Sequence, residues 1–442
     1  MAESFIPQGA GFGDCAAQHC GTQNGDNGRV GPSNHGADGD VAAFFARNGF
    51  DALATQDQCD EFARRAFPTA SLKSVAPQGY CSYTIAVNES HLLQFRPSAF
   101  ALNLGFSEEA RRVFGSLVPA IRHMGSVSGT SANALDAPGG LHLHVYLQER
   151  IQGETLAAFQ QRKDIPPDAM AECRRRLVED IAQFFAVSLR HARYEDGSEP
   201  FAKGHVGSTL RWRGELLQQL RQDQARRYAV SALRDLRRIE ASPWCLTHGD
   251  MVPANIMVDP RSGRLTGLID WAEGEWLPFG VGLYGLEEVL GQHEHMRGFV
   301  YYPEHEALRD AFWATFSAAS GLSVGSHAGL AAASSARRLG ILLWRGIAFE
   351  DGRIDRVVEQ GRDDAEIQKL ELFLSTPDRL PRRQPHAGGL SSALSMLRRL
   401  CEAMSASWKR LRVPLPRFFG SSAEVVALAK TTSDSTQGRY SA

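Results

Sequence analysis

Three polar residues between Thr247 and Trp271 have types and a spacing that suit phosphoryl transfer. Asp250 is followed five positions later by Asn255, and Asp270 stands at the end of an apolar run. Phosphoryl transfer needs a carboxylate that faces the attacking hydroxyl group, and oxygen ligands that hold Mg²⁺ against the phosphates. Two carboxylates and one amide supply these groups, so the stretch is a candidate site for this chemistry.

The residues between Asn255 and Asp270 predict a β-hairpin that would bring the two together. Residues 255–259 and 265–269 each have the composition of a short strand, and the Pro, Ser and Gly of residues 260–264 indicate a turn. A hairpin returns Asp270 to the end at which Asn255 begins, beside the loop that holds Asp250. The alternative is that Asp250 and Asn255 only close turns, which is a common role of Asp and Asn.

The same stretch resembles the aminoglycoside phosphotransferase and choline kinase group, whose signature is His-Gly-Asp, then Asn, then Ile-Asp-Trp. In this chain the signature residues are His248, Gly249, Asp250, Asn255, Ile269, Asp270 and Trp271. The resemblance implies that Asp250 is the catalytic residue and that Asn255 and Asp270 are the metal ligands. It also implies that His248 and Gly249 shape the loop, and that ATP and Mg²⁺ are the cofactors.

The fold that this resemblance implies is α+β: a protein-kinase-like bilobal fold with a small β-rich N-lobe and a mostly helical C-lobe. Residues 41–146 are expected to form the N-lobe and residues 147–376 the C-lobe with the catalytic loop. The Gly- and Asn-rich residues 1–38 are expected to be a disordered tail. Residues 377–442 are expected to contain a linker, an amphipathic helix and a polar tail.

Two expected strands of the N-lobe carry candidate contacts for the nucleotide. Alternating residues predict one strand over 80–87 and a second over 91–96. Kinases cover the phosphates with a Gly-rich loop and reach them with a Lys on the third strand. Here the loop offers Gly79 and Ser82, and the strand offers Arg96 in place of Lys. By resemblance these three residues bind the nucleotide; the alternative is that Arg96 is an exposed strand residue.

A helix is expected to begin with Ser107 as its N-cap, and it carries a possible partner for Arg96. Glu109, in the first turn, could pair with Arg96 as the helix Glu of kinases pairs with Lys. The alternative is that Glu109 only complements the helix dipole. The Ser-, Gly- and Asn-rich residues 125–140 predict a loop. Apolar periodicity predicts helices within residues 171–192, 210–239 and 305–374.

Composition limits the partners and the compartment. The 442 residues carry a net charge of −2, which argues against a nucleic-acid partner held by bulk charge. The N-terminus has no basic and apolar pattern of a signal peptide, and the seven scattered Cys favour a reduced, cytoplasmic setting. A membrane partner is not favoured, because no lipid-anchor signal accompanies the amphipathic segment at 394–411. Composition leaves the oligomeric state open.

Together these features predict an ATP-dependent phosphotransferase whose acceptor is a hydroxyl group of a small molecule. Two alternatives remain open. The missing Lys is compatible with a catalytically inactive nucleotide-binding protein. A protein kinase is the less favoured alternative, because Asp-Phe-Gly and Ala-Pro-Glu motifs are absent from the sequence.

Overall fold

The computed structural model describes residues 37–75, 78–132, 141–194, 201–320, 327–350 and 353–376. The chain divides into two units, residues 1–382 and 383–442, and everything described belongs to the first unit. The tail expected over residues 1–38 lies outside the described residues, except for its last two positions, which begin helix α1 (Ala37–Arg47). The linker, amphipathic helix and tail expected over residues 377–442 also lie outside the described residues.

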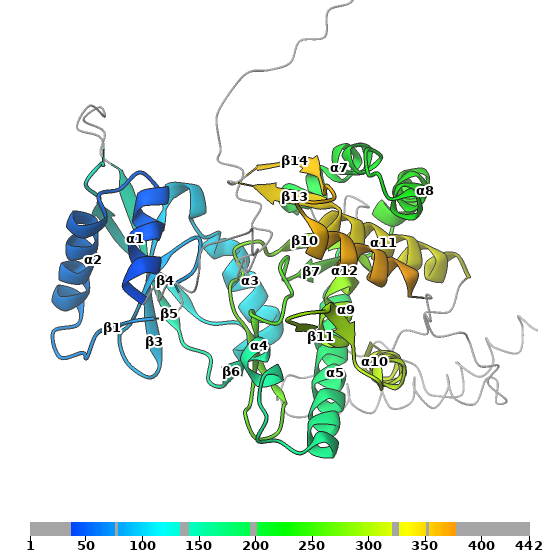
Figure 1. Ribbon diagram of the computed structural model, residues 1–442, viewed down its shortest axis with the longest axis horizontal. Coiled ribbons are helices and arrows are strands. Elements are labelled where there is room, and N and C mark those ends of the chain that lie inside the picture. Colours follow the sequence, from blue (N-terminus) through cyan, green and yellow to red (C-terminus); the bar gives the residue numbers. More distant parts are fainter. Residues whose placement is uncertain are drawn as a thin grey trace, which may run out of the picture. The chain divides into compact units, whose positions relative to one another are not determined.

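The first part of the described chain is built on a five-stranded antiparallel sheet (Figure 1). Its strands are β1 (Lys73–Ser74), β2 (Tyr83–Ala86), β3 (His91–Pro97), β4 (Ile121–Ser128) and β5 (His142–Glu149), in the spatial order β1-β2-β3-β5-β4. The two strands expected near residues 80–87 and 91–96 are confirmed as β2 and β3. The loop expected from residue 125 is wrong at its start, because residues 125–128 pair with β5 and extend β4.

One face of this sheet is apolar and packs against α1 and α2 (Ala52–Ala66). Strand residues alternate between faces, so Ile85, Leu93 and Val145 point to the same side. They form one buried cluster with Phe44 of α1 and Cys59 of α2. Residues at the intervening positions, which include Arg96, belong to the opposite, more polar face.

Helix α3 (Leu104–Phe114) begins four residues earlier than predicted. Asn103 caps it, because its Oδ1 accepts a hydrogen bond from Phe106 N at 3.1 Å. Ser107, expected to be the N-cap, lies one turn inside the helix and is buried. Sequence alone favoured Ser107 because two Glu residues follow it, but Asn is an equally good cap and stands at the real start.

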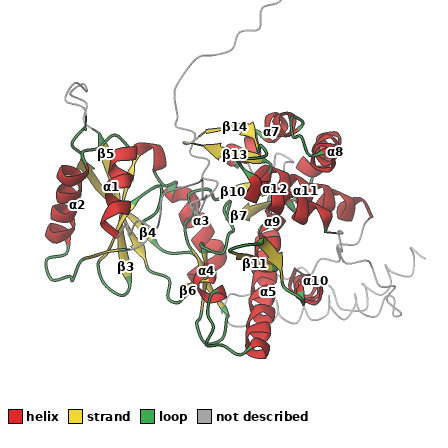
Figure 2. Ribbon diagram, viewed as in Figure 1, coloured by secondary structure: helices red, strands yellow, loops and turns green. Residues whose placement is uncertain are grey.

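The second part of the described chain is mostly helical (Figure 2). Its helices are α4 (Leu156–Gln160), α5 (Pro167–Arg190), α6 (Gly204–Ser208), α7 (Leu210–Leu217), α8 (Asp223–Glu240), α9 (Tyr284–Val289), α10 (His305–Ser320), α11 (His327–Arg345) and α12 (Asp364–Ser375). One 3-10 turn lies in this part, at Val281–Leu283, and two lie in the first part, at Ser98–Phe100 and Gly115–Leu117. The helix expected within residues 171–192 is confirmed as α5, whose apolar stripe enters the core.

Short antiparallel strands punctuate these helices. They are β6 (Glu154–Thr155), β7 (Trp244–Thr247), β8 (Ile256–Val258), β9 (Leu265–Leu268), β10 (Glu275–Pro278), β11 (Gly291–Glu294), β12 (Gly298–Tyr301), β13 (Ile347–Glu350) and β14 (Arg353–Val357). The hairpin predicted between Asn255 and Asp270 is confirmed as β8–β9. The prediction that residues 305–374 are helical is wrong over β13 and β14, which form a hairpin between α11 and α12.

The α+β class with a β-rich first part and a mostly helical second part, as in the protein-kinase-like fold, is thus confirmed. A large apolar core holds the second part together, and it includes residues of β7, β8 and β9. Strands β7 and β8 flank the loop that carries Asp250, and β9 pairs with β8. The loop is therefore anchored at both of its ends in a buried region.

Candidate functional site

The loop between β7 and β8 holds Asp250 in a buried position. Its side chain is 2% exposed. Gly249 precedes it with φ +82°, a conformation that residues with a Cβ rarely adopt. A Cβ built on Gly249 would lie 1.9 Å from the carbonyl oxygen of Glu273. Glycine is therefore required here by both the backbone and the space, which supports the prediction that Gly249 shapes the loop.

Asn255 is brought directly to Asp250. Its Nδ2 donates one hydrogen bond to the Asp250 carboxylate at 2.9 Å and another to the Asp250 carbonyl oxygen at 3.0 Å. Both residues are buried. The amide nitrogen of Asn255 faces Asp250, and its Oδ1 accepts no hydrogen bond from any described residue, so this oxygen remains available to a cation.

Asp270 is placed by the residue that precedes it. Ile269 N donates to Asn255 O at 2.9 Å, and Ile269 O lies 2.8 Å from Nε2 of His248. Both backbone groups of Ile269 are thus bonded to the loop that contains Asp250. Asp270 itself has φ +61° and is the one non-glycine residue with positive φ in the described chain. Such strain is uncommon and gathers at functional positions.

His248 connects this loop to the end of β9. Burial lowers the pKa of His248 to about 4, so the ring is neutral near pH 7. A neutral imidazole has one donor and one acceptor nitrogen. Nδ1 accepts from Asp250 N at 3.3 Å, so Nε2 carries the proton and donates to Ile269 O. His248 therefore ties Asp250 to the residue before Asp270.

Arg96 of β3 reaches Asp270. The guanidinium group donates to Asp270 Oδ1 at 3.1 Å, to Gln94 Oε1 at 3.2 Å and to Phe100 O at 3.5 Å. The Arg96 side chain is 3% exposed and that of Asp270 is 20% exposed. The alternative that Arg96 is an exposed strand residue is wrong, because the side chain is buried and oriented by three acceptors.

Gly79 and Ser82 lie just before β2, the strand next to β3. Ser82 is buried, and its hydroxyl group lies 3.1 Å from that of Thr84. The side chain of Gln78 bridges this segment, because it accepts from Thr84 N at 2.8 Å and donates to Val75 O at 2.6 Å. Thr84 is paired with Gln94, the residue that holds Arg96. The structure thus connects Ser82 to the strand that carries Arg96.

Glu109 does not meet Arg96. Its carboxylate accepts hydrogen bonds from Arg193 and from Trp276 Nε1, the latter at 3.3 Å. The suggested ion pair with Arg96 is thus replaced by one with Arg193, which follows α5. The physical reason lies in the packing of α3, whose apolar residues belong to the core of the helical part rather than to the cluster under the sheet.

Two residues near Asp250 were not chosen as site residues from the sequence. Glu273, three positions after Asp270, has one carboxylate oxygen that is buried without a hydrogen-bond partner. Burial first, and then the charges of Asp270 and Asp250, raise the pKa of Glu273 well above its usual value. Tyr284 hydrogen-bonds the backbone beside Asp250. An acidic residue so close to Asp270 was a usable sequence signal, whereas the contact of Tyr284 depends on tertiary structure.

The donor set at this site fits Mg²⁺. Mg²⁺ is commonly held by one or two protein oxygen ligands together with substrate phosphates and water. Asp270 offers a partly exposed carboxylate and Asn255 an amide oxygen, both hard ligands on neighbouring backbone segments. No cluster of three or more His, Cys, Asp or Glu residues suited to a metal occurs among the described residues. Such a cluster is not required here, because two protein ligands are enough when phosphates supply the others.

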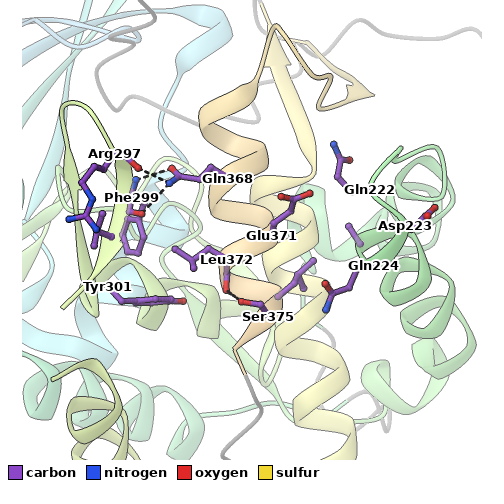
Figure 3. A pocket seen from close by; sticks show the side chains of 13 residues that line it. Gln222, Asp223, Gln224, Arg297, Phe299, Tyr301, Gln368, Glu371, Leu372 and Ser375 are labelled. Atoms are coloured by element: carbon purple, nitrogen blue, oxygen red, sulfur yellow. Dashed lines mark hydrogen bonds between the residues drawn. The ribbon is translucent and has the colours of Figure 1, made fainter. Parts of the chain in front are cut away.

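A separate cavity of about 770 Å³ lies among α8, β12 and α12 (Figure 3). Gln368 organises one wall of it, because its side chain accepts from Phe299 N at 2.9 Å and donates to Arg297 O at 2.8 Å. The residues that line this cavity include none of those predicted for the site.

The described helices include none that is long and apolar enough to cross a membrane.

Comparison with known proteins gave one match to a protein family and several solved structures. No curated protein sequence matches the chain. One similar structure is the GDP complex of aminoglycoside 2'-phosphotransferase-IIIa, with 14% identity and a TM-score of 0.40 over 72% of this chain and 99% of that chain. Another is an aminoglycoside-3'-phosphotransferase of type VIII, with 20% identity and a TM-score of 0.38 over 65% of this chain and 99% of that one.

A third is an aminoglycoside phosphotransferase from Streptomyces rimosus, with 15% identity and a TM-score of 0.38 over 66% of this chain and all of that one. The family assignment rests instead on a family model, which describes the phosphotransferase enzyme family and matches residues 109–280. The matched segment contains Asp250, Asn255 and Asp270. The resemblance predicted from the sequence is therefore confirmed, because residues 109–280 match the model of the phosphotransferase enzyme family.

Proposed function

We propose that the chain moves the γ-phosphoryl group of ATP to a hydroxyl group of a small molecule. The observation that carries the proposal is the convergence of three groups. The Asp250 carboxylate lies 2.9 Å from the Asn255 amide, and two backbone hydrogen bonds of Ile269 tie Asp270 to the same loop. The family model supports phosphotransferase chemistry for this segment.

Asp250 is the proposed catalytic residue. Its carboxylate orients the acceptor hydroxyl group and takes up its proton as the oxygen attacks the γ-phosphorus. The new O–P bond forms while the bond to the bridging oxygen breaks, and ADP leaves. Catalysis of this kind depends mainly on position and charge. The Nδ2 of Asn255 holds one oxygen of Asp250, which leaves the carboxylate with a defined direction toward the substrate.

Asn255 and Asp270 are the proposed ligands of Mg²⁺, which when bound would neutralise the charge of the phosphates. Asp270 adopts a positive φ, and its carboxylate accepts a hydrogen bond from Arg96. Arg96 would contribute a second positive charge beside the phosphates, and Gly79 and Ser82 would cover them. Arg can bind phosphate through two parallel hydrogen bonds, which Lys cannot do.

The test is turnover by the purified full chain with ATP, Mg²⁺ and a panel of small hydroxyl compounds. We expect Mg²⁺-dependent formation of ADP with at least one acceptor. Asp250→Asn should lower kcat by about two to four orders of magnitude, as is usual when an acid or base is removed. Asp259→Asn is the matched control, because Asp259 caps the turn of the same hairpin.

Equal rates for the native chain and Asp250→Asn would contradict the role of Asp250. Tight binding of ATP without turnover of any acceptor would instead favour the inactive nucleotide-binding protein. Phosphorylation of protein substrates but of no small compound would favour a protein kinase. The three outcomes differ in what is measured, so the experiment separates the proposal from both of its alternatives.

A further inference from the structure

Helix α9 packs so closely against the catalytic loop that only glycine fits at position 285. All six of its residues are buried. A Cβ built on Gly285 would lie 2.6 Å from Sδ of Met251, the residue after Asp250. The neighbouring residue on this helix, Tyr284, therefore has its ring directly beside the loop.

The hydroxyl group of Tyr284 makes two hydrogen bonds, one on each side of Asp250. It donates to the carbonyl oxygen of Gly249 at 2.9 Å and accepts from Met251 N at 2.9 Å. These two groups belong to the peptide bonds that precede and follow Asp250. Fixing both peptide planes limits the backbone rotation of Asp250 and therefore the direction in which its side chain leaves the loop.

Tyr284 is itself held firmly. Its ring stacks on Trp344 of α11, with centroids 4.5 Å apart and planes 14° from parallel. Burial raises the pKa of Tyr284 well above its usual value, so the hydroxyl group keeps the proton that it donates to Gly249. The side chain is 1% exposed. Solvent therefore does not compete for either hydrogen bond of the Tyr284 hydroxyl group.

Two buried glutamates anchor the same helix to its neighbours. Glu287 accepts hydrogen bonds from Arg309 of α10 at 2.6 and 2.8 Å and from Arg337 of α11 at 2.6 Å. Glu288 is paired with Arg345 of α11 and with Lys369 of α12. Helix α9 is therefore fixed to three helices, and Tyr284 extends from it to the loop.

We propose that Tyr284 is a positioning residue for Asp250, which sets the direction of the Asp250 carboxylate by holding both adjoining peptide groups. The inference rests on the proposed function, because it gives Asp250 the catalytic role. The hydroxyl group reaches the loop backbone from the end of an aromatic ring that is itself packed in the core.

Tyr284→Phe tests this proposal, because it keeps the ring and its stacking on Trp344 and removes only the hydroxyl group. We expect kcat to fall about 10- to 100-fold, as small displacements of catalytic groups typically cause. KM for ATP should stay nearly unchanged. Exchange of the Met251 amide hydrogen with solvent deuterium should become faster, because its acceptor is lost.

The control is Tyr301→Phe, which removes the hydroxyl group of a half-buried tyrosine that donates to Glu287 at 2.6 Å rather than to the loop. This variant should lower Tm without changing the kcat or the Met251 exchange. A Tyr284→Phe variant with native kcat and native exchange would overturn the proposal, and so would an equal loss of activity in both variants. If the native chain turns over no acceptor, the proposed function fails. In that case, the rate of amide exchange at Met251 in Tyr284→Phe still tests whether the Tyr284 hydroxyl group holds the loop.

Discussion

Arg96 and Asp270 form a salt bridge with 3.1 Å between their nitrogen and oxygen atoms, although 174 residues separate them in the sequence. It joins strand β3 of the sheet to the segment after β9 in the helical part. A buried Arg of the sheet thus has the proposed metal ligand as its partner. This arrangement makes the site dependent on both parts of the described chain.

The salt bridge can be measured with a double-mutant cycle. We expect Arg96→Met to lower the free energy of unfolding by about 1 to 3 kcal/mol, because it removes one member of a hydrogen-bonded charge pair. The double variant Arg96→Met/Asp270→Asn should cost less than the sum of the single variants, with a coupling of about 0.5 to 3 kcal/mol. Urea unfolding of the four proteins gives these values. Strict additivity would show that the contact does not contribute to stability.

Asp270→Asn should weaken Mg²⁺-dependent binding of ATP. Asn tolerates a positive φ, so the backbone at this position should be retained while the negative charge is removed. Mg²⁺ binds most strongly to charged oxygen ligands, and the expected loss of affinity is therefore specific to the metal. Calorimetry with ATP should show a lower affinity in the presence of Mg²⁺ and little change in the presence of a chelator. An unchanged affinity for Mg²⁺-ATP would exclude Asp270 as a ligand.

Gly249→Ala should distort the catalytic loop and destabilise the fold. Gly361 provides a matched control, because it has the same φ of +82° but no atom within 4 Å of a Cβ built on it. Gly361→Ala should cost about 1 to 2 kcal/mol from the backbone conformation alone. Gly249→Ala should cost more, since its Cβ would also displace the carbonyl oxygen of Glu273. Similar losses in thermal or urea unfolding would show that the loop can move aside.

Glu287→Gln should reveal a stability that depends on pH. Burial raises the pKa of Glu287, but the charges of Arg337 and Arg309 outweigh burial and lower it to about 2. The ionised form therefore stabilises the native chain above the unfolded pKa, and this contribution is lost as pH falls toward 2. The variant should be less stable by about 3 to 5 kcal/mol near neutral pH, as expected for a broken buried ion pair.

The difference between native chain and Glu287→Gln should shrink as the pH of urea unfolding is lowered from about 5 toward 2. Glu61→Gln is a suitable control, because its partner Arg64 is exposed and such pairs contribute about 0 to 1 kcal/mol. A gap between native and Glu287→Gln that stays constant over this range would contradict the linkage.

Local patterns in the sequence were sufficient to predict the centre of the site. The β8–β9 hairpin follows from two short apolar segments and a turn, and it alone explains why Asn255 and Asp270 meet. Helix α5 follows from its apolar stripe. These features depend on residues within about 25 positions of one another, over which strand and helix periodicity is informative.

Contacts between distant residues could not be predicted in the same way. The partner of Glu109 is Arg193, 84 residues away, and it was chosen by the packing of α3 rather than by charge alone. The contact of Tyr284 with the loop depends on how α9 is anchored by α10, α11 and α12. Strands β10 to β14 are short, and β10 is buried on both faces, so it lacks the alternation that marks a strand.

The attachment of α3 bears on how this protein could be controlled. Glu109 holds Arg193 and Trp276, and the apolar side of the helix is part of the large core. A regulator that worked by rotating this helix would have to break a salt bridge and expose core residues together. Helix α3 therefore resists rotation, and a regulator could not move it without a large cost in stability.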